Sequence, residues 1–221
     1  MMIANNILKL RAALPNNVTL VVVSKYQSIY EISQAYNAGQ RIFGESRALE
    51  MYDKFLALPF DIQWHFIGHL QRNKVKSIAP FVSLIQSVDS LELLQEINRQ
   101  ALRNERIIDV LLQFHIASEK TKSGFTDLDS ALRVVEALKS QDALKNVRIC
   151  GVMGMATDTP DTAQITREFE TLRNFFETLR SHVLDREAFK YLSMGMSGDY
   201  EIALRCGSNM VRIGGTIFYR P

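Results

Sequence analysis

The sequence predicts an α/β fold, a single (β/α)8 TIM barrel with an extra helix at its amino terminus. Eight short apolar or β-branched runs are typical of strands, and an amphipathic helical pattern follows each of the first seven. Strands that alternate with helices form right-handed βαβ units and a parallel sheet, and eight such units favour a closed barrel. An open doubly wound sheet is the alternative, although the sequence lacks the G-x-G-x-x-G fingerprint of dinucleotide-binding sheets.

Residues 1–14 are expected to form the leading helix, because their apolar positions recur at helical spacing. These positions are Ile3, Ile7, Leu8, Leu10 and Leu14. The amino terminus has no basic segment followed by an apolar segment, so the sequence does not predict a signal peptide. No apolar run approaches the roughly 20 residues that span a bilayer. We therefore expect a cytoplasmic protein that does not enter a membrane.

The barrel elements follow in order over residues 20–218. Each strand is a β-branched or apolar run that ends in a small, polar or glycine-bearing turn, after which the period becomes that of a helix. The predicted strands are residues 20–25, 41–45, 62–68, 81–88, 109–116, 147–155, 191–196 and 210–218. The predicted helices are residues 29–38, 48–56, 73–78, 91–103, 128–139, 162–184 and 200–206. Because 221 residues are few for this fold, which typically takes about 250, we expect one domain over residues 1–221.

The composition excludes several classes of protein. With 47% hydrophobic and 23% charged residues, the chain is not disordered or of low complexity. Lys and Arg total 26 against 24 for Asp and Glu, so no strong field attracts nucleic acid or an anionic membrane. The short basic run at residues 72–76 is interpreted as a solvated helix start, not a nucleic-acid site. Cys150 and Cys206 are too few for a disulfide framework, and we expect both to be buried free thiols.

Lys25 ends the first predicted strand. Alternation puts Val21, Val23 and Lys25 on one face. If that face is the barrel interior, burial depresses the pKa of the Lys25 amine and enables it to attack a carbonyl. The alternative is a lysine just past the strand that reaches water. Because the chemistry of such barrels lies at the carboxyl ends of the strands, Lys25 is a candidate site residue.

Two glycine-bearing loops accompany the last two strands. The seventh strand runs into Ser-Met-Gly-Met-Ser-Gly-Asp, which includes Met196 and Ser197, and the eighth contains Gly214 and Gly215. Glycines and small residues let backbone N–H groups approach an anion, and a following helix start adds its positive end. A helix cap or a tight strand end explains either loop alone. Two such loops at adjacent strand ends favour the phosphate site that barrels commonly have there.

Arg212 shares a strand face with Met210 and Gly214, and either face of a barrel strand is buried. The buried charge therefore needs a partner. One candidate is an inward carboxylate such as Glu45, and the other is a ring nitrogen of a bound cofactor. An amine for a Schiff base, a phosphate cradle and an arginine for a ring nitrogen together predict pyridoxal 5′-phosphate.

The sequence also resembles the pyridoxal phosphate homeostasis protein family, which looks like the fold type III barrel domain of alanine racemase standing alone. The resemblance covers nearly the whole chain, and the ordered set of motifs is highly specific. The motifs are VVVSKYQ at Val21, FGE at Phe43, WHFIGHLQRNK at Trp64, KSG at Lys122, GVMGM at Gly151, LSMGMSGD at Leu192 and GSNMVRIGGTIF at Gly207.

Carried over residue by residue, the resemblance implies a set of cofactor-binding residues and no catalytic one. They are Lys25 for the Schiff base, Met196, Ser197, Gly214 and Gly215 for the phosphate, and Arg212 for the pyridine nitrogen. Two positions depart from the family. The family usually has Thr after Arg-Ile-Gly, where this chain has Gly215 followed by Thr216, and Ser46 replaces the asparagine of FGEN. The first change loses or moves a hydroxyl contact, and the second alters a residue near the cofactor.

The expected activity is that of a carrier. Arg212 stays protonated, which keeps the pyridine nitrogen an acceptor and makes the ring a poor electron sink. In alanine racemase, the second base that racemisation needs comes from another domain of the partner subunit. The resemblance therefore implies a protein that binds pyridoxal phosphate, acts in intracellular vitamin B6 homeostasis and supplies the cofactor transiently to apo-enzymes, with little or no turnover. A pyridoxal-phosphate-dependent amino-acid racemase is the alternative, and a Schiff-base aldolase acting on a sugar phosphate is a further one.

Three histidines lie near the ends of the third and fifth predicted strands: His65, His69 and His115. Their spacing matches no recognised metal-ligand pattern, so we expect no metal site. His65 is interpreted as a polar wall of the cofactor pocket or as a satisfied histidine inside the barrel. Asn73 and Lys122 belong to the resembling motifs, and the residues themselves predict no role for either.

Overall fold

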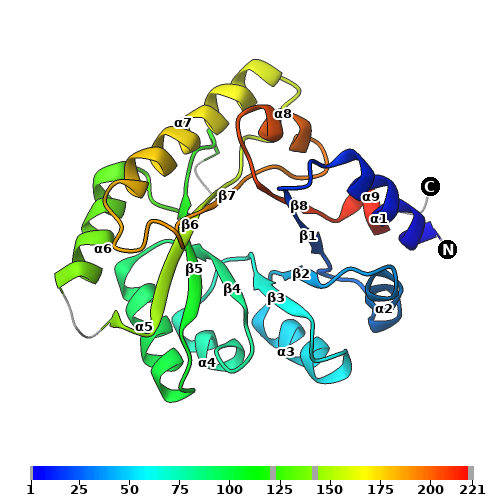
Figure 1. The fold of residues 1–221 in the computed structure, drawn as a ribbon, viewed down its shortest axis with the longest axis horizontal. Helices are drawn as coiled ribbons and strands as arrows, with labels where there is room; N and C mark the ends of the chain where they lie inside the picture. The colour runs from blue at the N-terminus through cyan, green and yellow to red at the C-terminus, as the bar shows by residue number, and fades with distance from the viewer. Residues whose placement is uncertain (1, 120–122, 141–143, 219–221) are drawn as a thin grey trace.

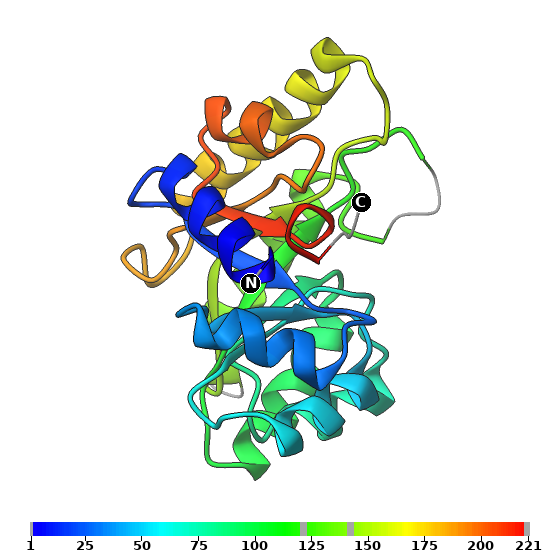
Figure 2. The ribbon, with the colours of Figure 1, turned by 90° about the vertical axis from the view of Figure 1, so that its right-hand side faces the viewer.

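The computed structural model describes residues 2–119, 123–140 and 144–218, and its eight parallel strands close into a barrel. The strands are ordered β1 to β8 as in the sequence, and β8 pairs with β1. The helices lie outside the ring of strands (Figures 1 and 2). The predicted barrel with a leading helix is therefore confirmed, and the open sheet is excluded.

The elements follow the predicted order closely. The strands are β1 (Thr19–Val23), β2 (Ile42–Glu45), β3 (Gln63–Phe66), β4 (Leu84–Val88), β5 (Ile108–Phe114), β6 (Val147–Gly154), β7 (Tyr191–Ser193) and β8 (Met210–Ile213). The helices are α1 (Met2–Ala13), α2 (Ile29–Asn37), α3 (Ala48–Ala57), the 3-10 turn η1 (Arg72–Lys74), α4 (Val75–Ile78), α5 (Leu91–Arg103), α6 (Leu128–Ser140), α7 (Thr162–Arg180), α8 (Tyr200–Arg205) and α9 (Gly215–Phe218).

The last strand is shorter than the sequence predicts, because the range Gly215–Phe218 forms a helical turn and not the end of a strand. The carbonyl of Gly214 accepts hydrogen bonds from the backbone N–H groups of Ile217 and Phe218, both at 3.0 Å. These bonds replace sheet pairing with a single turn of helix. Both glycines of the predicted strand therefore lie just past the carboxyl end of β8, where a loop can contact a ligand.

The leading helix packs on the outside of the barrel. Ile3, Ile7 and Leu10 form its buried stripe, as the helical spacing predicts. The side-chain amide of Asn6 donates to the carbonyl of Ile217 at 3.1 Å, which ties α1 to α9. Figure 1 shows α1 and α9 next to each other at the point where the barrel closes.

The core has two layers. The larger one lies between strands and helices and holds the bulkiest fully buried side chains, among them Trp64, Phe43, Phe66, Phe114, Phe169 and Phe189. The smaller one fills the barrel interior with Val21, Leu84, Leu111, Cys150, Met153 and Met210. Two residues further along their strands, buried polar side chains replace apolar ones: Gln86 follows Leu84, and Arg212 follows Met210. The interior therefore has an apolar floor and a polar layer toward the carboxyl ends of the strands.

Cys150 and Cys206 are free and buried, as predicted. Burial raises the pKa of the Cys150 thiol to about 12, so this group is an inert part of the interior core at neutral pH. Within the described ranges, no helix combines the length and the apolar character that crossing a membrane requires.

Candidate functional site

Closure of the barrel brings the first and last strands together. β1 pairs with β8 in parallel, and Val21 lies opposite Arg212. On the other side of β8, the backbone N–H of Arg212 donates to the carbonyl of Gly195 at 2.9 Å, which fixes the loop after β7. The turn that carries Lys25, the loop after β7 and the turn after β8 therefore meet at one end of the barrel.

Lys25 lies in the turn after β1, not on the inward face of the strand. β1 ends at Val23, and Lys25 is exposed. The chain turns because the backbone N–H of Ser24 still pairs with Gly44 at 3.0 Å, whereas the N–H of Gln27 bonds back to the carbonyl of Ser24 at 3.0 Å. Of the two interpretations of Lys25, the structure therefore agrees with the lysine just past the strand that reaches water. Lys25 is exposed at the mouth of the barrel.

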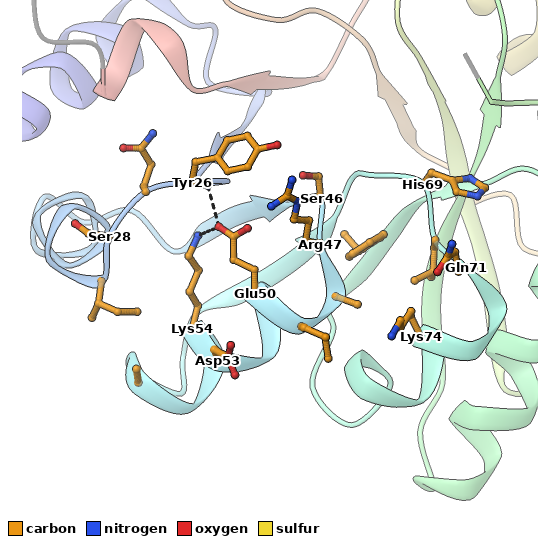
Figure 3. Close-up of a pocket in the computed structure, with 17 residues that line it drawn as sticks. Tyr26, Ser28, Ser46, Arg47, Glu50, Asp53, Lys54, His69, Gln71 and Lys74 are labelled. Carbon is orange, nitrogen blue, oxygen red and sulfur yellow. Dashed lines mark hydrogen bonds and ion pairs between the residues drawn. The ribbon is translucent and has the colours of Figure 1, made fainter. Parts of the chain in front are cut away.

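A buried lysine fixes this turn from below. The ammonium of Lys54 on α3 donates to three acceptors: Ser24 O at 2.8 Å, Glu45 Oε1 at 2.8 Å and Glu50 Oε1 at 2.6 Å. The same Glu50 oxygen accepts the backbone N–H of Tyr26 at 2.8 Å, and Figure 3 shows this arrangement. Ser24 and Tyr26 flank the candidate lysine. The ion cluster therefore ties both sides of the turn to α3. Lys54 was not predicted as a site residue, because it lies in a segment with an ordinary helical pattern.

Glu45 ends β2 inside this cluster. Its Oε1 also accepts the hydroxyl of Ser24 at 2.6 Å. Its Oε2 is buried without a hydrogen-bond partner among the described residues. Burial raises the pKa of Glu45, and the hydrogen bonds from Lys54 and Ser24 oppose that effect. Lys54 is therefore the ion-pair partner of this buried carboxyl group.

The two glycine-bearing loops face each other. A Cβ on Gly215 would stand 3.6 Å from the hydroxyl oxygen of Ser197, so the two residues are neighbours across the mouth. A Cβ on Gly214 would stand only 2.8 Å from the carbonyl oxygen of Val23, which no side chain tolerates. Gly214 therefore lets β1 and β8 approach each other where both strands end. The predicted phosphate residues Ser197, Gly214 and Gly215 lie together beside the Lys25 turn.

Met196 contributes to this loop through its backbone. Its N–H donates to Asp199 Oδ1 at 2.6 Å, and its carbonyl accepts the N–H of Tyr200 at 2.9 Å. The backbone N–H of Met196, a residue that the resemblance places at the phosphate, is thus engaged within the protein. Met196 shapes the turn on which Ser197 is presented.

Arg212 is 3% exposed and extends across the barrel interior. Its Nη1 donates to the hydroxyl of Ser193 at 2.6 Å, and its Nη2 donates to the carbonyl of Gly154, at the end of β6, at 2.9 Å. The salt bridge to Glu45 is not formed, because Glu45 pairs with Lys54. Burial lowers the pKa of Arg212 to about 10, against an opposing effect of Asp199. The guanidinium is therefore charged at pH 7, and these contacts use two of its five N–H donors.

His65 is a satisfied histidine of the barrel interior. Its Nδ1 lies 3.0 Å from the amide nitrogen of Gln86, and burial lowers the pKa of His65 to about 3. His69 is exposed at the mouth, with its Nδ1 3.5 Å from Asp89 and 3.4 Å from the hydroxyl of Ser123. In the part of the chain that the structure describes, no group of three or more His, Cys, Asp or Glu side chains could hold a metal ion.

The other residues singled out from the sequence lie around the mouth. Ser46 is half-buried after β2, and a Cβ on Gly68 would collide with it. Thr216 is exposed on α9, and Asn73 is exposed in the 3-10 turn η1. Lys122 lies outside the described residues.

A surface groove with a volume of about 890 Å³ opens next to this region (Figure 3). Tyr26, Ser46 and Arg47 line it on the barrel side, and the start of α2, one side of α3 and the segment from His69 to Lys74 line most of the rest. Lys25 and Arg212 are not among its lining residues. The groove therefore adjoins the mouth and does not form the floor of the candidate site.

Comparison with known proteins identifies the family. Residues 2–221 match the family described as alanine racemase, N-terminal domain. A pyridoxal phosphate homeostasis protein of Haemophilus influenzae is 34% identical over 206 residues, which are 92% of this chain and 85% of the relative. One from Synechocystis is 37% identical over 211 residues, which are 94% of this chain and 93% of the relative.

Solved structures agree with this result. PipY of Synechococcus elongatus, solved without pyridoxal phosphate, has a TM-score of 0.90 and 33% identity, and the match covers 98% of this chain and 100% of PipY. PipY with pyridoxal phosphate bound has a TM-score of 0.86 and 32% identity, with the same coverage. Alanine racemase from E. faecalis shares the fold, with a TM-score of 0.70 at 16% identity, over 100% of this chain and 58% of the racemase. On its fold and on these matches along nearly its whole length, this chain belongs to the pyridoxal phosphate homeostasis protein family.

Proposed function

We propose that this chain holds pyridoxal 5′-phosphate as a Schiff base on Lys25 and acts in vitamin B6 homeostasis, supplying the cofactor to apo-enzymes with little or no turnover. The observation that carries the proposal is the convergence of three groups at one end of the barrel. These are the free amine of Lys25, the facing Ser197 and Gly215, and the buried cation of Arg212.

The residues at the mouth fit the three parts of this cofactor. Ser197 and the backbone of Gly214 and Gly215 would hold the phosphate, since small residues without side-chain bulk let N–H groups approach an anion. Arg212 would donate to the pyridine nitrogen, since its guanidinium has donors beyond those used by the protein. When bound, pyridoxal phosphate supplies an aldehyde that reacts with amines and a ring that can accept electrons.

The buried arginine supports a carrier more than a racemase. Its pKa of about 10 keeps the guanidinium protonated at neutral pH, so Arg212 has a proton to donate and none to accept. A ring nitrogen held opposite it would stay an unprotonated acceptor, and the ring would then withdraw electrons weakly. A ring of this kind would stabilise less well the carbanion that racemisation forms.

The position of Lys25 supports transfer of the cofactor. The amine is exposed in a turn whose two flanking residues are held by the Lys54 cluster. A fixed but open amine lets water or an acceptor lysine of an apo-enzyme reach the Schiff base. Transient contact with apo-enzymes at this mouth is part of the proposal.

The experiment that tests the proposal starts with protein that is incubated with pyridoxal phosphate and then desalted. The absorption spectrum is recorded before and after borohydride reduction for the wild type, Lys25→Ala and Lys76→Ala, the last a control at an exposed lysine of α4. We expect a band that borohydride traps on the peptide containing Lys25, and that only Lys25→Ala loses. A colourless wild type, or a band that survives in Lys25→Ala, would overturn the assignment.

Two further assays separate a carrier from an enzyme. Loaded protein is mixed with an apo-enzyme, and recovery of the enzyme's activity is followed against the same concentration of free cofactor. Loaded protein is also incubated with L-alanine, and formation of the D-isomer is measured. Transfer without racemisation supports the proposal, and sustained racemisation would favour the alternative.

A further inference from the structure

A chain of hydrogen bonds crosses the barrel interior from Arg212 to the opposite wall. Arg212 Nη1 lies 2.6 Å from Ser193 Oγ, Ser193 Oγ lies 2.6 Å from Gln86 Oε1, and Gln86 Nε2 lies 3.0 Å from His65 Nδ1. The four residues come from β8, β7, β4 and β3. All four side chains are buried, with exposed fractions of 0% to 5%. The chain therefore lies in the polar layer just above the apolar floor.

The hydrogen bonds run in one direction with the amide of Gln86 as the structure orients it. A guanidinium has donors and no acceptor, so Ser193 accepts from Arg212, and its hydroxyl donates to Gln86 Oε1. The oxygen of the Gln86 amide then faces Ser193, and its nitrogen faces His65. Since this nitrogen donates, His65 Nδ1 must accept, and the ring proton lies on Nε2. With this orientation, every hydrogen bond of the chain points from Arg212 toward His65.

The three residues behind Arg212 carry no charge. Ser193 and Gln86 are neutral by nature, and burial holds His65 neutral at pH 7. Asp199 acts on Arg212 electrostatically from the loop after β7 and does not belong to the chain. The guanidinium is therefore oriented by dipoles and is not neutralised by a contacting carboxylate. Its charge stays available to a ligand.

We propose that Gln86 is a positioning residue that acts through Ser193 to aim the guanidinium of Arg212 at the ring nitrogen of pyridoxal phosphate, with His65 anchoring the far end of the chain. The inference rests on the proposed function. It extends that function, because Gln86 would influence the electronic state of the bound ring without contacting the ring. Apolar side chains at these positions would avoid the cost of burying polar groups, which are stable in an interior only when each has a hydrogen-bond partner.

The test uses Ser193→Ala, Gln86→Leu and the double variant. Gln113→Leu is the matched control, because Gln113 is a buried glutamine of β5 that donates to the carbonyl of Ser123 at 2.6 Å and is not in the chain. For each protein, we measure the dissociation constant for pyridoxal phosphate and the nitrogen-15 chemical shift of the ring-labelled cofactor. Thermal unfolding confirms that each variant is folded, and Ser193→Ala removes only one oxygen atom.

We expect each single variant to weaken binding about 10-fold and to shift the ring-nitrogen signal away from its wild-type position. The double variant should lose little more than the larger single loss, because both substitutions break one chain. Gln113→Leu should keep the wild-type nitrogen signal. An unchanged signal in Gln86→Leu, or fully additive losses, would overturn the inference while leaving the proposed function intact.

A second measurement needs no cofactor. Nitrogen-15 spectra of ligand-free protein labelled at histidine should show His65 with an unprotonated Nδ1 and a protonated Nε2, assigned by its loss in His65→Gln. Gln86→Leu should move this signal. The opposite tautomer in the wild type would contradict the direction of the chain. A wild type that has the expected tautomer but forms no borohydride-trapped adduct would instead refute the proposed function, and the inference with it.

Discussion

The ammonium nitrogen of Lys54 lies 2.8 Å from Glu45 Oε1, and the two side chains are 6% and 0% exposed. This buried pair lies directly beneath the turn that presents Lys25. Its other contacts, to the carbonyl of Ser24 and to Glu50, connect β1, β2 and α3. An ion pair of this kind is costly to break, because removing one partner leaves the other charge buried and alone.

Lys54→Met should therefore reduce the free energy of unfolding by about 3–5 kcal/mol, measured by urea denaturation. It should also weaken the reaction of pyridoxal phosphate with Lys25, because the turn loses its support. The double variant with Glu45→Gln should recover part of the stability, since no buried charge is left unpaired. Lys76→Met, at an exposed lysine, serves as the control. A loss below about 1 kcal/mol would show that the cluster is not structural.

The buried imidazole of His65 predicts a pH dependence of stability. Its pKa falls from 6.5 in the unfolded chain to about 3 in the folded protein. Between these values the unfolded chain binds a proton that the folded protein does not. His65 therefore does not lower the free energy of unfolding above pH 6.5. As the pH falls from 6.5 toward 3, protonation of the unfolded chain reduces the free energy of unfolding by up to about 1.4 kcal/mol per pH unit.

His65→Gln should flatten this dependence between pH 6.5 and the onset of acid unfolding, as measured by denaturation at a series of pH values. His69→Gln, at a histidine whose side chain is 62% exposed, is the comparison variant. The difference between variant and wild type isolates His65 from carboxyl groups such as Glu45. Equal slopes in all three proteins would contradict the prediction.

Gly214→Ala should separate the ends of β1 and β8. The added Cβ would stand 2.8 Å from the carbonyl oxygen of Val23, and a backbone atom cannot move aside as a side chain does. We expect a loss of about 1–3 kcal/mol in the free energy of unfolding and a clear loss of cofactor affinity. Gly198→Ala is the steric control, since nothing lies within 4 Å of its added Cβ. Wild-type stability in Gly214→Ala would refute the close approach.

Gly215→Thr should strengthen binding of pyridoxal phosphate. The residue is exposed, its Cβ would meet Ser197 Oγ only at 3.6 Å, and a hydroxyl would add a donor to the phosphate loop. One hydrogen bond to a charged group would lower the dissociation constant about 10-fold or more. Gly215→Ala adds the Cβ without the hydroxyl and should bring no such gain. If the Thr and Ala variants bind pyridoxal phosphate with equal affinity, the hydroxyl does not contact the phosphate as predicted.

The sequence was enough to predict the barrel, because strand and helix periods alternate without interruption. The sequence did not predict where some strands end. The run through Gly214 has the composition of a strand, and only the hydrogen bonds of its carbonyl turn the chain into α9. Alternation along the predicted strand left open whether Lys25 is buried or reaches water, and the end of β1 at Val23 decides for water.

Long-range partners were the other limit. His65 could be interpreted as a satisfied barrel histidine, but nothing near it in the chain indicates Gln86 or Ser193. A usable signal was present in both residues, since Gln86 is polar within the fully buried strand β4 and Ser193 is polar at the buried end of β7. Lys54 gave no signal, because a lysine on an amphipathic helix is ordinarily solvated. Its burial follows from how α3 packs over β1 and β2.

The pairing of β1 with β8 has a consequence for the life of the protein in the cell. The proposed ligand contacts come from the turn after β1 and from the loops that follow β7 and β8, so the site is incomplete until the last two strands have joined the first. Capture of the cofactor would then report that the ring of strands has closed. Any fluctuation that separates β1 from β8 would release the ligand. Retention of the cofactor therefore depends on the barrel staying closed.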